Sequence, residues 1–181
     1  MWRETKNGKR FRIRQLVPGD EAALLAYLDA LSLATRQRFA PHPFDADTIQ
    51  TVCTRPDQPF RCFVAEDAGG QLAAYMLARI DVPGHEFQRL AGYGVFPEPG
   101  YTASFAPSVA DHWQHSGIGS AMYGFIEQDL RQSGIRQIML MGGVQSDNLS
   151  AIRYYEKLGF QKLGGFWHES FFNEDMIRWL V

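Results

Sequence analysis

The segment Gln114–Ser120, which reads QHSGIGS, is the part of the sequence that most clearly indicates a chemical function. Gly117 and Gly119 stand directly before an apolar pattern that predicts a helix over residues 117–133. The first backbone N–H groups of a helix have no partner inside it, and the helix dipole adds partial positive charge there. Glycines leave no side chain to block a ligand. The segment therefore predicts a cradle for a phosphate or pyrophosphate.

Two common phosphate-binding patterns do not fit these glycines. A Walker loop needs G-x-x-x-x-G-K-[ST], and no Lys follows here. A dinucleotide fingerprint, G-x-G-x-x-G, would need glycine at Met122, and no acidic ribose partner is evident. A tight turn without a ligand and a phosphate-loop protein of another kind both stay open on the glycines alone.

A second patterned segment, residues 148–160, reads NLSAIRYYEKLGF. Together the two segments resemble the signatures of the GNAT superfamily of N-acyltransferases, [Q/R]-x-x-G-x-[G/A] and N-x-x-A-x-x-x-Y-x-K-x-G-F. The second signature is matched at Asn148, Ala151, Tyr155, Lys157, Gly159 and Phe160. The resemblance is clear over residues 102–169 and weaker but compatible over 11–80. The stretch VADHWQ is similar to a subgroup that includes acyltransferase domains of bacterial protein-lysine acetyltransferases.

The resemblance implies acetyl-CoA as the acyl-donor cosubstrate. Val109 and Ala110 would offer backbone groups to the pantetheine arm, and residues 115–120 would bind the pyrophosphate. Asn148 would contact the pantetheine arm, cap the helix that follows it, or do both. The donor-binding residues implied by the resemblance are Ser108, Val109, Ala110, Gln114, His115, Ser116, Gly117, Ile118, Gly119, Ser120, Asn148, Ala151 and Tyr155.

The catalytic residues that the resemblance implies are Tyr155 and Ser104. Tyr155 would protonate the leaving thiolate. Ser104 stands where many relatives carry a basic Glu, and it could hold a water but not act as a base itself. We expect a neutral amine to attack the thioester directly in a ternary complex, with a backbone N–H polarising the carbonyl oxygen. Substitute bases, each expected to be a solvated surface residue, are Glu66, His85, Glu86 and Glu98.

The composition and net charge limit the classes of partner that the protein is expected to bind. The 181 residues are 45% hydrophobic and 21% charged, with a formal net charge of -2, which does not favour nucleic-acid binding. The basic N-terminus lacks the apolar core of a signal peptide, and no apolar run is long enough to span a bilayer. We expect a cytoplasmic protein without membrane contact. Cys53 and Cys62 are expected to be free and buried, and no metal is predicted, because no Cys or His has metal-ligand spacing.

The elements that position these residues alternate along one domain, residues 1–181. We expect a strand at 11–17, helices after Asp20 and at 45–55, two strands joined at Gly69–Gly70, and a strand at 102–111 before the glycine turn. Residues 82–101 are the least regular part. Pro107 predicts an edge, bulge or splay in its strand.

This order indicates an α/β domain of the α+β type with a mixed, mostly antiparallel sheet. The resemblance makes this a GNAT fold, with about six to seven strands, about four helices and splayed central parallel strands.

Two functions of different class stay open. One is an acetyl-CoA-dependent N-acetyltransferase acting on a small-molecule amine or a protein lysine. The other is a non-catalytic module that binds or senses acyl-CoA, for which the missing Glu is mild support. His42 could contact the acceptor, although a polar loop residue is the simpler interpretation. The sequence also leaves open whether the protein forms a homodimer.

Overall fold

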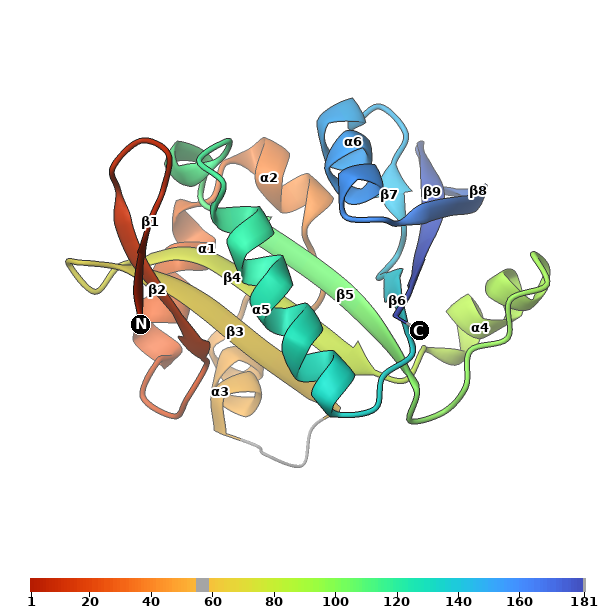
Figure 1. Cartoon of the computed structure of the whole chain (residues 1–181), viewed down its shortest axis with the longest axis horizontal. Coiled ribbons are helices and arrows are strands. Elements are labelled where there is room, and N and C mark those ends of the chain that lie inside the picture. Colours follow the sequence, from red (N-terminus) through yellow and green to blue (C-terminus); the bar gives the residue numbers. More distant parts are fainter. Residues whose placement is uncertain (55–58, 181) are drawn as a thin grey trace. The chain divides into compact units, whose positions relative to one another are not determined.

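Nine strands and six α-helices form the described part of the chain, residues 1–54 and 59–180, in this computed structural model (Figure 1). The strands are β1 (Trp2–Glu4), β2 (Arg10–Gln15), β3 (Phe60–Asp67), β4 (Leu72–Ile80), β5 (Thr102–Val109), β6 (Gln137–Leu140), β7 (Val144–Gln145), β8 (Gln161–His168) and β9 (Phe171–Trp179). The helices are α1 (Glu21–Ala30), α2 (Leu33–Arg38), α3 (Ala46–Thr54), α4 (Gly84–Ala91), α5 (Ile118–Gln132) and α6 (Leu149–Lys157). The strands pair in the order β1-β2-β3-β4-β5-β6-β9-β7, and β8 pairs with β9.

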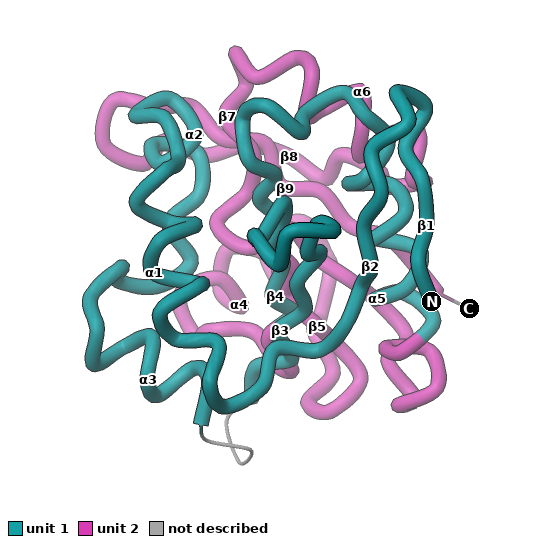
Figure 2. Tube along the Cα trace, turned by 90° about the vertical axis from the view of Figure 1, so that its left-hand side faces the viewer, with its two compact units in different colours: residues 1–78, 106–128 teal, residues 79–105, 129–181 magenta. Residues whose placement is uncertain are grey.

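The chain divides into two compact units, which Figure 2 shows in different colours. Unit 1 comprises residues 1–78 and 106–128, and unit 2 comprises residues 79–105 and 129–181. Strands β4 and β5 each contribute residues to both units.

In unit 1, helices lie on both faces of the antiparallel strands β2, β3 and β4 (Figure 1). Helix α5 covers one face, where Phe125 meets Phe63 of β3 edge to face with ring centroids 5.8 Å apart. Helices α1 and α3 lie on the other face and contribute Leu24, Leu28 and Ile49, which are fully buried. The apolar spacing that predicted α5 thus anchors this helix, and with it the turn before it, on the sheet.

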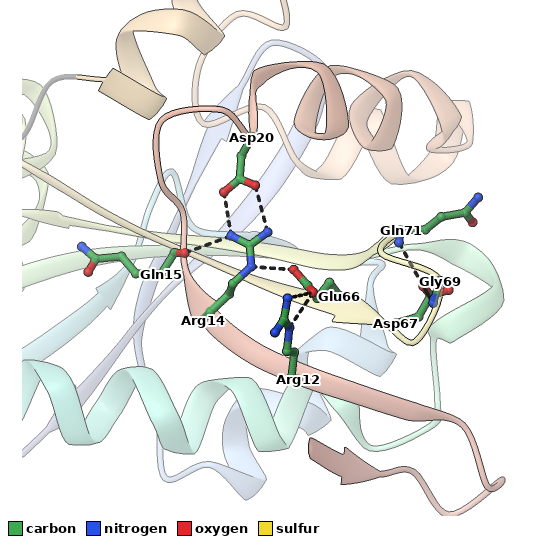
Figure 3. Close-up of polar contacts among 8 residues, drawn as sticks. All are labelled: Arg12, Arg14, Gln15, Asp20, Glu66, Asp67, Gly69 and Gln71. Atoms are coloured by element: carbon green, nitrogen blue, oxygen red, sulfur yellow. Dashed lines mark hydrogen bonds and ion pairs between the residues drawn. The ribbon is translucent and has the colours of Figure 1, made fainter. Parts of the chain in front are cut away.

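A network of charged side chains fixes the start of α1 to β2 and β3 (Figure 3). Arg14 forms two hydrogen bonds to Asp20, at 2.6 and 2.8 Å, and a third to Glu66 at 2.5 Å. Arg12 also pairs with Glu66. The helix begins after Asp20 as predicted, but the Asp20 side chain makes no capping bond, because it accepts from Arg14 and from Val17 N–H instead.

In unit 2, β9 pairs with more strands than any other described strand does. It pairs antiparallel with β6, β7 and β8, while β6 also pairs in parallel with β5. Helix α4 contributes Leu90 to a core that it shares with Val95, Met139 of β6 and Ile177 of β9. The parallel β5–β6 pair agrees with the parallel central strands that the resemblance implies.

The fold class is confirmed, and the differences lie in short elements. Strands β1 and β7 and helices α2 and α4 were not predicted, so the described strands and helices outnumber those expected. Helix α4 forms within the segment taken as irregular because Leu90 packs in the core and its polar side chains find partners in unit 2. Helices this short depend on such tertiary contacts rather than on intrinsic propensity.

Candidate functional site

The glycine turn connects the end of β5 to α5 through a short 3-10 helix, Asp111–Trp113. Two residues adopt positive φ, His115 at 59° and Gly117 at 91°, and they redirect the chain into the helix. Trp113 and Ile118, on either side of the turn, are buried at 5% and 1% exposure. The turn is therefore held at both ends by core packing, and its backbone is placed by the sheet and the helix together.

The backbone N–H groups of this turn are bare. Within residues 1–54 and 59–180, no atom accepts a hydrogen bond from the N–H groups of residues 115–120. The first helical bond runs from Ala121 N–H to Gly117 C=O, at 3.1 Å. Consecutive N–H groups near a left-handed residue form a concave anion-binding nest, and the α5 dipole reinforces it. The arrangement suits a phosphate or pyrophosphate.

Side chains around the turn hold it in shape. The Ser116 hydroxyl is buried and donates to Trp113 C=O at 2.5 Å. Lys9, from the β1–β2 hairpin, donates to His112 C=O at 2.9 Å, and its ammonium lies 4.7 Å from the centre of the Trp113 ring. The turn is consequently preorganised before any ligand arrives.

Strand β5 carries backbone groups beyond the point where its ladder with β6 ends. The last pair is Phe105–Leu140, and Met141 N–H then donates to Phe105 C=O at 3.0 Å. Strand β5 continues through Pro107 to Val109. Backbone groups alternate between the two edges of a strand, so Pro107 and Val109 face the same edge as Phe105. Pro107 lies inside a paired strand rather than at an outer edge, and there it has no N–H to leave unsatisfied.

Of the two residues expected to meet a pantetheine arm, one has its backbone groups occupied. Ala110 N–H donates to Ala73 C=O at 3.0 Å, and Ala110 C=O accepts from Trp113 N–H at 2.7 Å. Val109 C=O accepts from the Gln114 amide at 3.3 Å. This leaves Val109 N–H as the donor of this pair that can reach a ligand.

Asp111 has a structural role that its sequence context did not predict. Its carboxylate accepts from the Ser32 N–H at 3.0 Å, from the Ser32 hydroxyl at 2.7 Å and from the Thr35 hydroxyl at 2.8 Å. The Gln114 amide lies 3.4 Å from the same Thr35 oxygen. These bonds tie the start of α2 to the segment just before the glycine turn.

Ser108 lies in a buried polar chain of unit 1. Its hydroxyl bonds to the Tyr27 hydroxyl at 2.9 Å and to Tyr75 C=O at 3.1 Å. The Tyr75 hydroxyl in turn lies 3.0 Å from His42 Nε2, and burial lowers the pKa of His42. The Ser108 side chain thus braces β5 from within, and His42 is a partner of the core as well as a loop residue.

In unit 2, Asn148 caps α6. Its side-chain oxygen accepts from Ala151 N–H at 3.2 Å, so the capping role is confirmed and the amide NH₂ remains for other partners. Helix α6 ends at Lys157, and Gly159 beyond it adopts a φ of 86°, a left-handed conformation typical of the residue that follows a helix.

Tyr155 is buried at 8% exposure against Phe160 and Tyr154, with ring centroids 5.5 and 5.2 Å away. Burial raises the pKa of Tyr155 above that of an ordinary phenol.

The residues that stand in for the missing basic Glu differ in burial and in hydrogen-bond partners. Ser104 is fully buried and lies 3.4 Å from Asp81 C=O, and no hydrogen bond joins it to Tyr155 among the described residues. The expectation that Glu66 and Glu86 are solvated was wrong, because they are 5% and 4% exposed. Glu66 forms ion pairs with Arg12 and Arg14 of β2.

Glu86 accepts from Gly142 N–H at 2.6 Å, just past the end of β6. Burial raises its pKa, although Gly142 N–H, Arg89 and His85 oppose the shift. His85 and Glu98 are exposed, as expected, and Glu98 pairs with Arg136 at 3.5 Å. The segment 82–101 thus contains a buried, hydrogen-bonded carboxylate, that of Glu86, which its many Pro and Gly residues did not predict.

Other predictions about side chains can be checked directly. Cys53 and Cys62 are free and buried, as expected, and burial raises the pKa of Cys62 to about 11. Within the described ranges, His, Cys, Asp and Glu do not gather in any group of three or more that could hold a metal ion. No described helix has the length and apolar character needed to cross a membrane.

Comparison with known proteins identifies what this geometry resembles. A family model described as the acetyltransferase (GNAT) family matches residues 26–160. A mycothiol acetyltransferase from Nocardiopsis dassonvillei is 29% identical over 158 residues, which are 84% of this chain and 43% of that protein. This chain therefore spans less than half of that curated relative.

Solved structures share the fold. The GNAT domain of S. lividans PAT has a TM-score of 0.78 at 18% identity, covering 99% of this chain and 96% of that one. The structure of yncA from Salmonella typhimurium with its cofactor acetyl-CoA has a TM-score of 0.67 at 17% identity, covering 94% of both chains.

Proposed function

Because this chain belongs to the acetyltransferase (GNAT) family, we propose that residues 1–181 form one domain that transfers the acetyl group of acetyl-CoA to a primary amine. The observation that carries the proposal is the run of bare N–H groups at residues 115–120. A preorganised nest at a helix start is what the pyrophosphate of CoA requires. The acceptor is a small-molecule amine or a protein lysine.

The acyl donor would be held by residues from several elements. The N–H groups of residues 115–120 bind the pyrophosphate, and Val109 N–H bonds to the pantetheine arm. Asn148 uses its free NH₂ group for the same arm while its oxygen caps α6. Ser108 and Ala110 support β5 through bonds of their own, so their contribution to donor binding is indirect.

In the proposed reaction a neutral amine attacks the thioester carbonyl, a C–N bond forms, the C–S bond breaks, and the amine nitrogen gives up one proton to water, which restores the proton that Tyr155 donates. Tyr155 gives its proton to the departing thiolate. Burial raises the pKa of this phenol, so it carries its proton at neutral pH. Ser104 is a positioning residue that can hold a water near the amine. Tyr155→Phe should lower kcat and leave the affinity for acetyl-CoA nearly unchanged.

The direct test of donor binding is calorimetric titration with acetyl-CoA. We expect the wild type to bind and the Gly117→Glu, Gly119→Glu double variant not to bind. Gly134→Glu is the matched control, because Gly134 has a φ of 82°, close to the 91° of Gly117, and the space for a Cβ is open at both. Loss of binding in the control as well would assign the effect to backbone strain. A folded wild type that does not bind would refute the proposal.

The alternative is a non-catalytic acyl-CoA sensor, favoured by the buried Ser104 in place of a basic carboxylate. Turnover separates the two. Release of free CoA thiol with a panel of small amines and lysine peptides supports the enzyme, and tight binding without turnover for the whole panel supports the sensor.

A further inference from the structure

A pocket of about 280 Å³ lies in unit 1, between the β1–β2 hairpin and the start of α5. Pockets that enclose a whole drug-sized ligand run from about 300 to 1,000 Å³, so this one suits one part of a larger molecule. Its lining comes from the hairpin and from the glycine turn: Arg3, Glu4, Thr5, Lys6, Phe11, Ser116, Gly117 and Ala121.

Two cations of this hairpin, Arg3 and Lys6, face the pocket without a partner. Both are exposed, and no described residue forms an ion pair or hydrogen bond with either side chain. The other hairpin cations are engaged. Lys9 bonds to His112 C=O, Arg10 stacks on Trp2 with 5.5 Å between its guanidinium and the ring centre, and Arg12 and Arg14 pair with Glu66.

The opposite wall of the pocket is the glycine turn. A Cβ built at Gly117 would meet no atom within 4 Å, so this wall is open toward the pocket. Ser116 and Gly117 belong both to the pocket lining and to the bare N–H run. An anion in the pocket would meet the exposed cations Arg3 and Lys6, with the Glu4 carboxylate between them in the chain, on one side and the positive end of α5 on the other.

We propose that this pocket binds the 3′-phosphate on the ribose of the CoA acyl donor, and that Arg3 and Lys6 select CoA over donors lacking that group. The inference rests on the proposed function, since the pyrophosphate must first occupy the adjoining turn. In CoA the 3′-phosphate is carried by the ribose that follows the pyrophosphate. A molecule seated on the turn by its pyrophosphate therefore has a second, dianionic group within a few bonds of it.

The hairpin is held in place for this role. Lys9 fixes it to His112 and Trp113, the residues directly before the turn, so Arg3 and Lys6 need no ligand to bring the hairpin close. The proposal thereby assigns a role to the basic N-terminal segment, for which the sequence indicated none.

The test compares CoA with 3′-dephospho-CoA by calorimetric titration. We expect the wild type to bind CoA about tenfold more tightly, since charge-assisted hydrogen bonds to a phosphate contribute on this scale. Arg3→Ala and Lys6→Ala should each lower CoA affinity while leaving 3′-dephospho-CoA affinity unchanged, and the double variant should make the two equal. Arg10→Ala is the matched control, because it removes a charge from the same hairpin outside the pocket.

Each outcome is decisive. Equal wild-type affinity for the two ligands overturns the pocket assignment and leaves the proposed function standing. A preference that persists in the Arg3→Ala, Lys6→Ala variant, or that Arg10→Ala removes equally, also overturns it. Failure of the wild type to bind either ligand refutes the proposed function itself. Both substituted residues are exposed, so the variants should keep the wild-type unfolding temperature, which scanning calorimetry checks.

Discussion

The starts of α5 and α6 solve the same physical problem in opposite ways. Each helix begins with N–H groups that have no partner inside the helix. At α6, Asn148 supplies an oxygen, which accepts from Ala151 N–H at 3.2 Å. At α5, the residue before the helix is Gly117, which has no side chain, and the N–H groups of residues 115–120 meet no acceptor among the described residues.

A helix start that serves only the fold and one suited to a ligand differ in where the acceptor for their first N–H groups comes from. A third start, that of α2, behaves like α6, because Ser32 accepts from Thr35 N–H and Asp111 accepts from Ser32 N–H. Where the chain supplies an oxygen that accepts from a first-turn N–H group, the helix start needs no ligand as acceptor. Where it withholds one and holds the bare turn in shape with Ser116 and Lys9, the N–H groups stay available to the outside anion that we propose.

The largest expected effect comes from giving the bare start an anion of its own. Gly117→Asp should lower acetyl-CoA affinity at least about 100-fold, because the carboxylate repels the pyrophosphate and competes for its donors. Asn148→Asp places the same charge at the completed start of α6 and should lower affinity by a much smaller factor. Titration of both variants measures the contrast. Equal losses would mean that the two starts do not differ in kind.

Much of this contrast could be predicted from the sequence, because it depends on residues that are close together in the chain. The glycines, the helical spacing and the capping type of Asn148 are all encoded within a few residues of where they act. The bare turn of α5 and the capped start of α6 were therefore predictable, as were the buried cysteines.

What the sequence concealed depends on residues far apart in the chain. Glu86 becomes buried because Gly142, distant in sequence, offers it an N–H, and Glu66 because Arg12 and Arg14 lie on the next strand. Asp111 meets Ser32 across a separation of 79 residues. No periodicity reports such pairings, so the surface assignments of the two glutamates were wrong and Asp111 went unnoticed.

The next effect concerns the shape of the bare start. Ser116→Ala removes the hydroxyl that donates to Trp113 C=O and should lower the free energy of unfolding by about 1–2 kcal/mol, because a buried carbonyl loses its partner. Urea denaturation measures this. Ser133→Ala, at the other end of α5, removes an exposed hydroxyl that bonds to Asp129 C=O and should cost less than about 0.5 kcal/mol. Similar losses in both would show that the turn is not specially braced.

A smaller effect is expected at the completed start. Asn148→Ala should lower the free energy of unfolding by about 1 kcal/mol, the usual cost of a lost N-cap. Asn148→Asp retains an acceptor and should keep that stability, while losing the NH₂ group proposed to meet the pantetheine arm. Thermal unfolding and acetyl-CoA titration of the same two variants separate the roles. If both variants lose stability equally, the cap contributes nothing.

The smallest effect is a pH dependence at the start of α2. Hydrogen bonds from Ser32 N–H and then from the Ser32 and Thr35 hydroxyls hold the pKa of Asp111 below its usual range, against a smaller effect of burial. A carboxyl whose pKa is depressed in the folded state stabilises that state above its unfolded pKa, about 3.9 for Asp, and loses the contribution as pH falls through the folded value.

Asp111→Asn should therefore be less stable than the wild type near pH 6, and the gap should close as pH falls below about 3.9, where the wild-type carboxyl becomes protonated. Urea midpoints of both proteins across this range measure the gap. A constant gap would mean that the carboxylate charge does not complete the α2 start and that the hydrogen bonds alone do. The α2 start would then resemble the neutral cap of α6, and the anion proposed at α5 would have no counterpart at α2.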